Sequence, residues 1–239
     1  MIPIRDENPS ATTPWVTYTL IGINSFVFVL QLSMPRESLM QVVKALGFVP
    51  LRATAALQGE AGLITGLGIP AVTSMFMHGG WLHLIGNMWY LYLFGDNVED
   101  GLGHERFIAF YLGCGLFATL AQYLISPYSQ VPVIGASGAI AGVLGAYLVV
   151  WPRARIITLL PIFFFITFVH LPAMVVLGFW FIVQFFQGVA AVGATGGGVA
   201  YWAHVGGFAL GAFLIKFLPF KHTPGRRRSR YPRNPRYWR

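Results

Sequence analysis

Four polar side chains with catalytic potential lie inside otherwise apolar stretches of this sequence: His83, Asn87, Ser137 and His204. A serine hydroxyl becomes a strong nucleophile when a neighbouring base takes its proton, and histidine is the usual base. His83 and Asn87 are one helical turn apart, so in a helix they share a face, where both can donate hydrogen bonds to a developing oxyanion. These residue types predict acyl transfer by a Ser137–His204 dyad.

No carboxylate accompanies this pair. The acidic residues all lie near the ends of the apolar stretches or between them: Asp6, Glu7, Glu37, Glu60, Asp96, Glu99, Asp100 and Glu105. A Ser-His-carboxylate triad and the paired intramembrane aspartates of an aspartyl protease are therefore both excluded. His104-Glu105 lacks the second histidine of a zinc-protease motif, and the single cysteine, Cys114, cannot build a cysteine-based metal cluster. We expect no metal and no other cofactor.

The composition is that of a membrane protein. Only 10% of the 239 residues are charged and 56% are hydrophobic, whereas a soluble domain carries about 25% charged residues. A soluble enzyme is therefore excluded. A helix needs about 20 apolar residues to cross a bilayer, and six runs of roughly this length are present: 14–34, 79–95, 105–126, 135–151, 171–192 and 198–218. The expected fold class is an all-α membrane protein with six transmembrane helices.

Two connections between these spans are long. Pro161 and Pro172 interrupt the apolar chain before the fifth span, so 156–170 is expected to be a loop or interfacial chain. Residues 35–78 form an external connection that should contain short interfacial helices, because long structureless loops are uncommon.

The formal net charge of +8 resides in the C-terminal end, whose basic residues are Lys221, Arg226, Arg227, Arg228, Arg230, Arg233, Arg236 and Arg239. Basic segments remain on the cytoplasmic side of a membrane, so six spans should place both termini there. We expect a cytoplasmic segment 1–13, a six-span domain 14–219 and a basic cytoplasmic tail 220–239 that contacts anionic lipid. Nucleic acid is not an expected partner, because its binding needs positive charge on a folded face.

The second, fourth and sixth spans run in the same direction. They should bring His83, Ser137 and His204 to one level, about 18–21 Å from the inner ends of the helices at ~1.5 Å per residue. The fourth and sixth spans also carry small residues at four-residue spacing, which let helix backbones approach closely in lipid. Such stripes are common in general membrane packing, but their position beside Ser137 and His204 favours a catalytic contact.

Three segments resemble the signature motifs of the rhomboid intramembrane serine proteases: Gly135-Ala136-Ser137-Gly138-Ala139, Ala203-His204-Val205-Gly206-Gly207 and the stretch from His78 to Asn87. The likeness extends from about Thr73 to Leu218. It implies a rhomboid-like six-helix bundle around a cavity that is open to the outside and filled with water.

The roles that the resemblance implies are specific. Ser137 would be the nucleophile and His204 the general base, while Asn87, His83 and the Ser137 amide would form the oxyanion hole. Two further residues would be accessory to the site: Gly135 beside the serine, and His78 at the rim of the cavity.

The resemblance further implies an endopeptidase that cleaves membrane proteins in or near their transmembrane segments. The resemblance is to the bacterial, six-span type of the family, so the expected location is the bacterial cytoplasmic (inner) membrane. The alternative is a proteolytically inactive rhomboid-like protein that binds or routes membrane clients, although the presence of both Ser137 and His204 favours the protease.

Two positions refine this comparison. Some relatives have a tyrosine that stacks on the histidine where this chain has Ala141, so the orientation of His204 must depend on other contacts, such as the glycines of the sixth span. Glu99 matches a family glutamate, and Arg106 is its expected partner.

Overall fold

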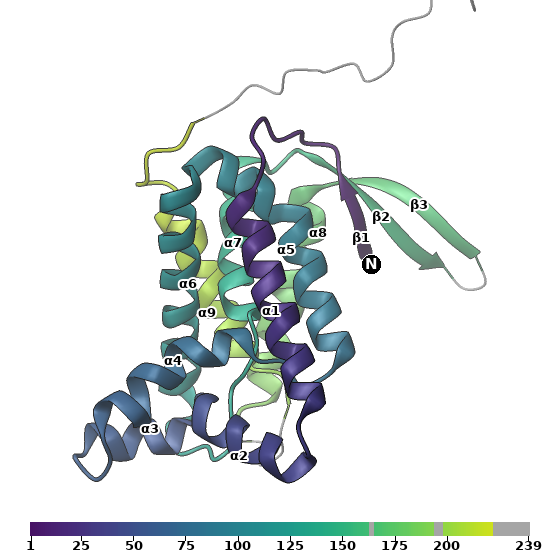
Figure 1. Ribbon diagram of the computed structural model, residues 1–239. Helices are drawn as coiled ribbons and strands as arrows, with labels where there is room; N and C mark the ends of the chain where they lie inside the picture. Colours follow the sequence, from purple (N-terminus) through teal and green to yellow (C-terminus); the bar gives the residue numbers. More distant parts are fainter. Residues whose placement is uncertain (163–164, 194–197, 222–239) are drawn as a thin grey trace, which may run out of the picture.

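The computed structural model describes residues 1–162, 165–193 and 198–221. Its six long helices run side by side as a bundle (Figure 1): α1 Trp15–Ser33, α5 Trp81–Leu102, α6 His104–Ile125, α7 Ser137–Val150, α8 Ala173–Ala190 and α9 Tyr201–Leu214. They coincide with the six expected spans, which confirms the all-α membrane fold. Three of them, α1, α6 and α8, are long and apolar enough to cross a membrane by length and composition. The basic tail after Lys221, with its expected lipid contact, lies outside the described residues.

The connection between α1 and α5 carries several short helices. They are α2 Arg36–Leu46, α3 Pro50–Leu57, a π-helical turn at Ile64–Gly68, α4 Ile69–Thr73 and a 3₁₀ turn at Ser74–Phe76. Figure 1 shows α2 and α3 lying across the end of the bundle rather than along it. This is the end at which α7 begins with Ser137, so the short helices lie at the same end of the bundle as the candidate site.

A three-stranded sheet leaves the bundle at its other end; two of its strands lie between α7 and α8 in sequence, and the third comes before α1. Its strands are β1 Ile2–Asp6, β2 Arg155–Ile162 and β3 Phe165–Pro172, in the order β1-β2-β3 with both pairs antiparallel. The prediction of a loop over 156–170 was therefore wrong, because these residues form strands, whereas their placement at the membrane interface stays a prediction. The β-branched and aromatic residues of this stretch favour a strand, and the prolines stand near the ends of its strands rather than within a helix.

The centre of the bundle is the contact between α7 and α9. Every residue of α7 from Gly138 to Tyr147 is buried. A Cβ atom added to Gly207 would lie 2.0 Å from the carbonyl oxygen of Gly138, and one added to Gly211 would lie 2.0 Å from that of Gly142. The two backbones are thus in direct contact, as the small-residue stripes predicted.

A side chain near the C-terminal end of α5 binds the N-terminal end of α1. The buried carboxylate of Glu99 accepts hydrogen bonds from the amides of Val16 and Thr17, at 2.9 and 2.8 Å, and contacts His104 Nδ1 at 2.6 Å. A carboxylate in this position satisfies unpaired N–H groups at a helix N-terminus. Among the described residues the basic side chain that contacts Glu99 is His104, so the expected pairing with Arg106 was wrong.

Candidate active site

Ser137 and His204 meet across the contact of α7 and α9. The Ser137 hydroxyl lies 2.7 Å from His204 Nε2, within hydrogen-bond range, and the His204 side chain is buried. Ser137 is the first residue of α7, where the chain enters the helix from a turn at Gly135 with φ +124°. The close approach of the two helix backbones brings the hydroxyl and the imidazole together.

Gln184 of α8 is a site residue that the sequence analysis missed. Its side-chain oxygen lies 2.6 Å from His204 Nδ1. An amide oxygen can only accept, so Nδ1 carries the proton and Nε2 presents its lone pair to the serine. A polar side chain inside an apolar span is itself a functional signal, and Gln184 could have been found on that ground.

Trp180, one turn before Gln184, packs beside the same imidazole. The ring centroids of Trp180 and His204 are 5.7 Å apart with an interplanar angle of 33°. Where some relatives have a tyrosine, this chain has Ala141, and the indole of α8 supplies a ring contact instead. The orientation of His204 therefore depends on α8 rather than on the glycines of α9 alone.

Two hydrogen-bond donors lie at the cavity that Ser137 lines: the side chain of Asn87 on α5 and the amide of Ser137 itself. Asn87 is buried, lines the same cavity as Ser137, and its Nδ2 atom has no hydrogen-bond partner among the described residues. The Ser137 amide has no partner within its own helix, because it belongs to the first turn of α7. Both are donors available to a substrate oxygen.

His83 lies directly against Gly135. Its Nδ1 atom accepts a hydrogen bond from the Gly79 amide at 3.4 Å, so Nε2 carries the proton and can donate. A Cβ atom on Gly135 would lie 2.7 Å from both Cε1 and Nε2 of His83. Glycine is thus required at 135 by its positive φ and by the packed ring.

His78 is not at the rim of the cavity, where it was expected. It is buried, its backbone amide and carbonyl bind the side chain of Gln31 at 3.0 and 3.1 Å, and its ring lies edge-on to His83 at 5.1 Å. Burial, with His83 close by, lowers the pKa of His78 to about 4. A neutral ring behind His83 supports that side chain rather than contacting a substrate.

The site opens into a cavity of about 1440 Å³. Ser137, His204, His83 and Asn87 all line it, together with the loop 125–135 that leads into α7. The volume is sufficient for an extended peptide segment. No cluster of three or more potential metal-binding side chains occurs within the described ranges.

Comparison with known proteins supports the family resemblance. A family model described as the Rhomboid domain matches residues 62–219, more than half of the chain. Presenilin-associated rhomboid-like protein A, mitochondrial, from Danio rerio is 34% identical over 139 residues, which are 56% of this chain and 36% of that protein. Putative rhomboid protease YdcA from Bacillus subtilis is 39% identical over 77 residues, 32% of this chain and 38% of the relative. The chain thus spans less than two fifths of the length of these relatives.

The expected bacterial cytoplasmic membrane is contradicted by this comparison. Besides the Danio rerio protein, the mammalian relatives are named as mitochondrial, and Rhomboid-like protein 11 from Arabidopsis thaliana, 37% identical over 92 residues, 37% of this chain and 32% of that protein, is named as chloroplastic. The assignment to a bacterial inner membrane was therefore wrong. Motifs and basic residues describe the fold and its direction in a membrane, and neither encodes which membrane holds it.

Proposed function

Because this chain belongs to the rhomboid family, we propose that it is an intramembrane serine endopeptidase that hydrolyses peptide bonds in or near the transmembrane segments of other membrane proteins. The observation that carries the proposal is the 2.7 Å contact between Ser137 Oγ and His204 Nε2 at the wall of a large cavity. A nucleophile within hydrogen-bond reach of an oriented base is the arrangement that acyl transfer requires.

In the first half of the reaction His204 Nε2 takes the proton of the Ser137 hydroxyl as Oγ bonds to the carbonyl carbon of the substrate. The negative charge that develops on the substrate oxygen is stabilised by the Ser137 amide, Asn87 Nδ2 and His83 Nε2. The carbon–nitrogen bond then breaks, and the departing amine takes the proton from His204. The C-terminal fragment of the substrate leaves as this amine, and the N-terminal fragment remains bound through its carbonyl carbon as an ester of Ser137.

In the second half a water molecule replaces the amine. His204 takes a proton from the water, whose oxygen attacks the ester carbon, and the same three donors stabilise the oxyanion. The bond to Ser137 Oγ breaks as His204 returns the proton, which restores the hydroxyl. Gln184 accepts from Nδ1 throughout and so keeps Nε2 as the atom that exchanges protons.

An inactive protein that binds membrane clients is the second candidate. It would retain the cavity but would not need the Ser137–His204 hydrogen bond. The presence of that contact, with Gln184 behind the histidine, favours the protease.

A fluorophosphonate probe, which reacts with activated serines, distinguishes the two functions. In the full chain reconstituted in lipid, we expect labelling of the wild type and parallel cleavage of a single-span reporter protein. Ser137→Ala should abolish both, and His204→Ala should reduce both to a comparable extent, because the pair acts as a unit.

Ser126→Ala is the matched control, because Ser126 lines the same cavity but is not the proposed nucleophile. It should retain labelling and cleavage. Unchanged labelling of Ser137→Ala would refute the assignment of the nucleophile, and a wild type that neither reacts nor cleaves would favour the client-binding function.

A further inference from the structure

The three-stranded sheet has one face against the bundle and one face turned outward. On the inner face, Thr158 is fully buried and Asp6 accepts a hydrogen bond from the Tyr147 hydroxyl at 2.8 Å. On the outer face the side chains of Ile2, Phe168 and Ile166 are 52%, 60% and 70% exposed. Large apolar side chains exposed on a folded sheet indicate a surface that another apolar phase covers.

The outer face changes character along the strands. The strand register places Ile2, Leu159 and Phe168 in one row, and Pro161 and Ile166 in the next row toward the turn. In the opposite direction, the adjacent row contains Arg5, Ile157 and His170, and Arg155 follows. The apolar and basic rows are two residues apart, or about 7 Å at ~3.3 Å per residue. The face is thus apolar toward the turn and basic toward the bundle end.

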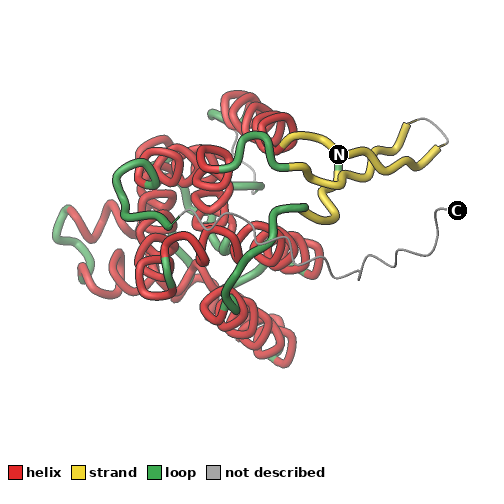
Figure 2. Tube along the Cα trace, turned by 90° about the horizontal axis from the view of Figure 1, so that it is seen from above, coloured by secondary structure: helices red, strands yellow, loops and turns green. Residues whose placement is uncertain are grey.

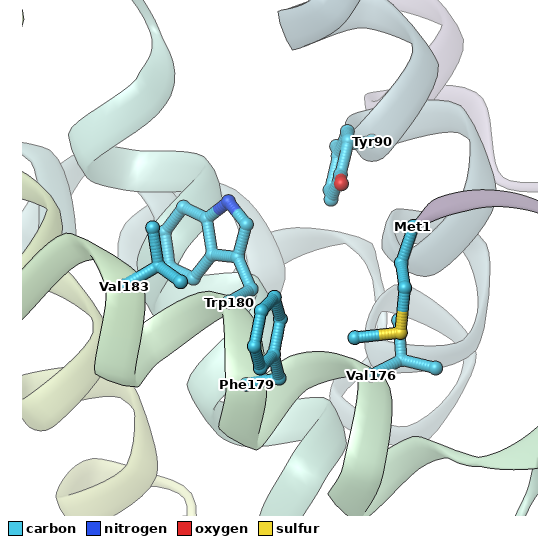
Figure 3. Close-up of a pocket in the computed structure, with 6 residues that line it drawn as sticks. All are labelled: Met1, Tyr90, Val176, Phe179, Trp180 and Val183. Atoms are coloured by element: carbon cyan, nitrogen blue, oxygen red, sulfur yellow. The ribbon is translucent and has the colours of Figure 1, made fainter. Parts of the chain in front are cut away.

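Contacts of the first strand with α5 and α8 determine where these rows lie along the axis of the bundle. Trp89 Nε1 of α5 donates to the Pro3 carbonyl at 2.7 Å. Met1 shares a small cavity with Tyr90 of α5 and with Val176 and Phe179 of α8 (Figure 3).

Tyr90 lies about 9 Å along α5 from Asp96, at ~1.5 Å per residue. The row that begins at Ile2 therefore lies beside the apolar parts of both helices and not beyond their ends.

The views of the whole chain agree with this position of the sheet along the bundle axis. In Figure 1 the strands slope from the end of the bundle toward its middle, and in Figure 2 they extend outward from the helices, in yellow. On α8, which contacts β2 and β3, the apolar side chains of Met174 and Ile182 are also exposed.

We propose that the outer face of this sheet is a membrane-binding surface that lies in the leaflet at the end of the bundle opposite Ser137. Its apolar rows contact acyl chains, and its basic row contacts the phosphates of anionic headgroups. The headgroup layer on each side of a bilayer is about 5–8 Å thick, which matches the spacing between the two kinds of row. Arg5 and Arg155 supply charge, whereas the acid Glu7 is engaged by His170 at 3.3 Å.

Backbone hydrogen bonding limits how deep the sheet can lie. β3 is the last strand of the sheet, so one of its edges has no strand partner within the described ranges. Unpaired backbone groups are very costly in hydrocarbon but can be satisfied at the headgroup layer. The sheet therefore rests in the interfacial zone of one leaflet, as amphipathic surface helices do, and does not cross the bilayer.

Site-directed spin labelling of the full chain tests the depth. In a Cys114→Ala background, nitroxides are placed singly at Phe168, Ile166 and His170, and at Ile182 of α8 as the lipid-facing reference. The protein is reconstituted in vesicles of phosphatidylcholine and phosphatidylglycerol. Oxygen, which partitions into lipid, should relax the labels at Phe168 and Ile166 more than a water-soluble nickel complex does, as at Ile182. The label at His170 should show the opposite preference.

Three outcomes would contradict the proposal. Water-like accessibility at both Phe168 and Ile166 would place the outer face in solvent or against a soluble partner. Spin–spin broadening that disappears on dilution with unlabelled chain would show that a second copy covers the face. Omission of phosphatidylglycerol should shift the His170 label toward the nickel complex, and the absence of any shift would refute the contact with anionic headgroups.

Discussion

The hydrogen bond from His204 Nδ1 to Gln184 determines which imidazole nitrogen can act as the base. Gln184→Leu removes the acceptor, so the histidine can adopt the unproductive tautomer. A neutral hydrogen bond contributes about 1 kcal/mol net, and we expect kcat to fall about five- to tenfold with KM unchanged. Turnover of a membrane-embedded reporter measures both constants.

The control for this variant is Gln187→Leu, which replaces an exposed glutamine on the same helix and should leave kcat unchanged. Gln184→Glu restores an acceptor and should recover most of the loss. If Gln184→Leu instead raised KM at constant kcat, Gln184 would contact the substrate and would not position the histidine.

Asn87 presents a buried amide nitrogen that has no partner among the described residues. An oxyanion donor acts mainly in the transition state, so Asn87→Ala should lower kcat by roughly 10²–10³-fold with little change in KM. Steady-state kinetics on the same reporter separates the two constants. A thermal unfolding curve close to that of the wild type would show that the loss is not one of folding.

At the residue scale, the side chains that could be predicted from the sequence are the reactive ones that lie within a short recognisable motif. Ser137, His204, His83 and Asn87 stand out because each lies in one of the three short motif segments, 135–139, 203–207 and 78–87. Gln184 was missed because it belongs to no recognised motif, and its partner His204 lies on another helix, α9. His78 was misplaced because burial depends on Gln31, whose contact no local pattern predicts.

At the scale of elements, the α7–α9 contact determines whether the dyad can form. A methyl group at position 211 would collide with the backbone of Gly142. Gly211→Ala should therefore separate the helices and destabilise the protein by about 1–3 kcal/mol, the usual cost of overpacking. We expect a lower unfolding temperature in detergent and weaker reaction with a serine probe.

Gly178→Ala is the matched control, because a Cβ atom on Gly178 meets nothing within 4 Å. Alanine favours a helix over glycine, so this variant should be as stable as the wild type or slightly more stable. Equal destabilisation by both substitutions would mean that helix flexibility, and not the backbone contact, underlies the effect.

The sheet shows where prediction of elements from the sequence fails. Apolar runs of the right length identify spans reliably, because a helix satisfies its own backbone within one segment. A strand needs a partner, and the partner of β2 on one side is β1, at the opposite end of the chain. The prolines in 156–172 indicated that no helix continues there but not which strands pair.

At the scale of the whole molecule, Asp6 connects the sheet to the bundle at the end opposite the dyad. It accepts from the Tyr147 hydroxyl, lies near Asp96, and has Arg5 as its neighbour in the chain. Burial, followed by the charge of Asp96, raises the pKa of Asp6 from 3.8 to about 7. The attached sheet therefore holds a proton on Asp6 that the detached strand would release near pH 4.

The sign of the pH effect follows from this difference. Between about pH 4 and pH 7 the attached form binds more protons than the detached form, so attachment weakens as the pH rises through this window. A nitroxide at Ile2, in a Cys114→Ala background, should become more mobile when the pH is raised from about 5 to about 8. Asp6→Asn keeps an uncharged side chain at every pH and should abolish the change. A pH response that persists in Asp6→Asn would assign the effect to another group, and constant mobility in the parent would show that Asp6 does not control how the sheet is held.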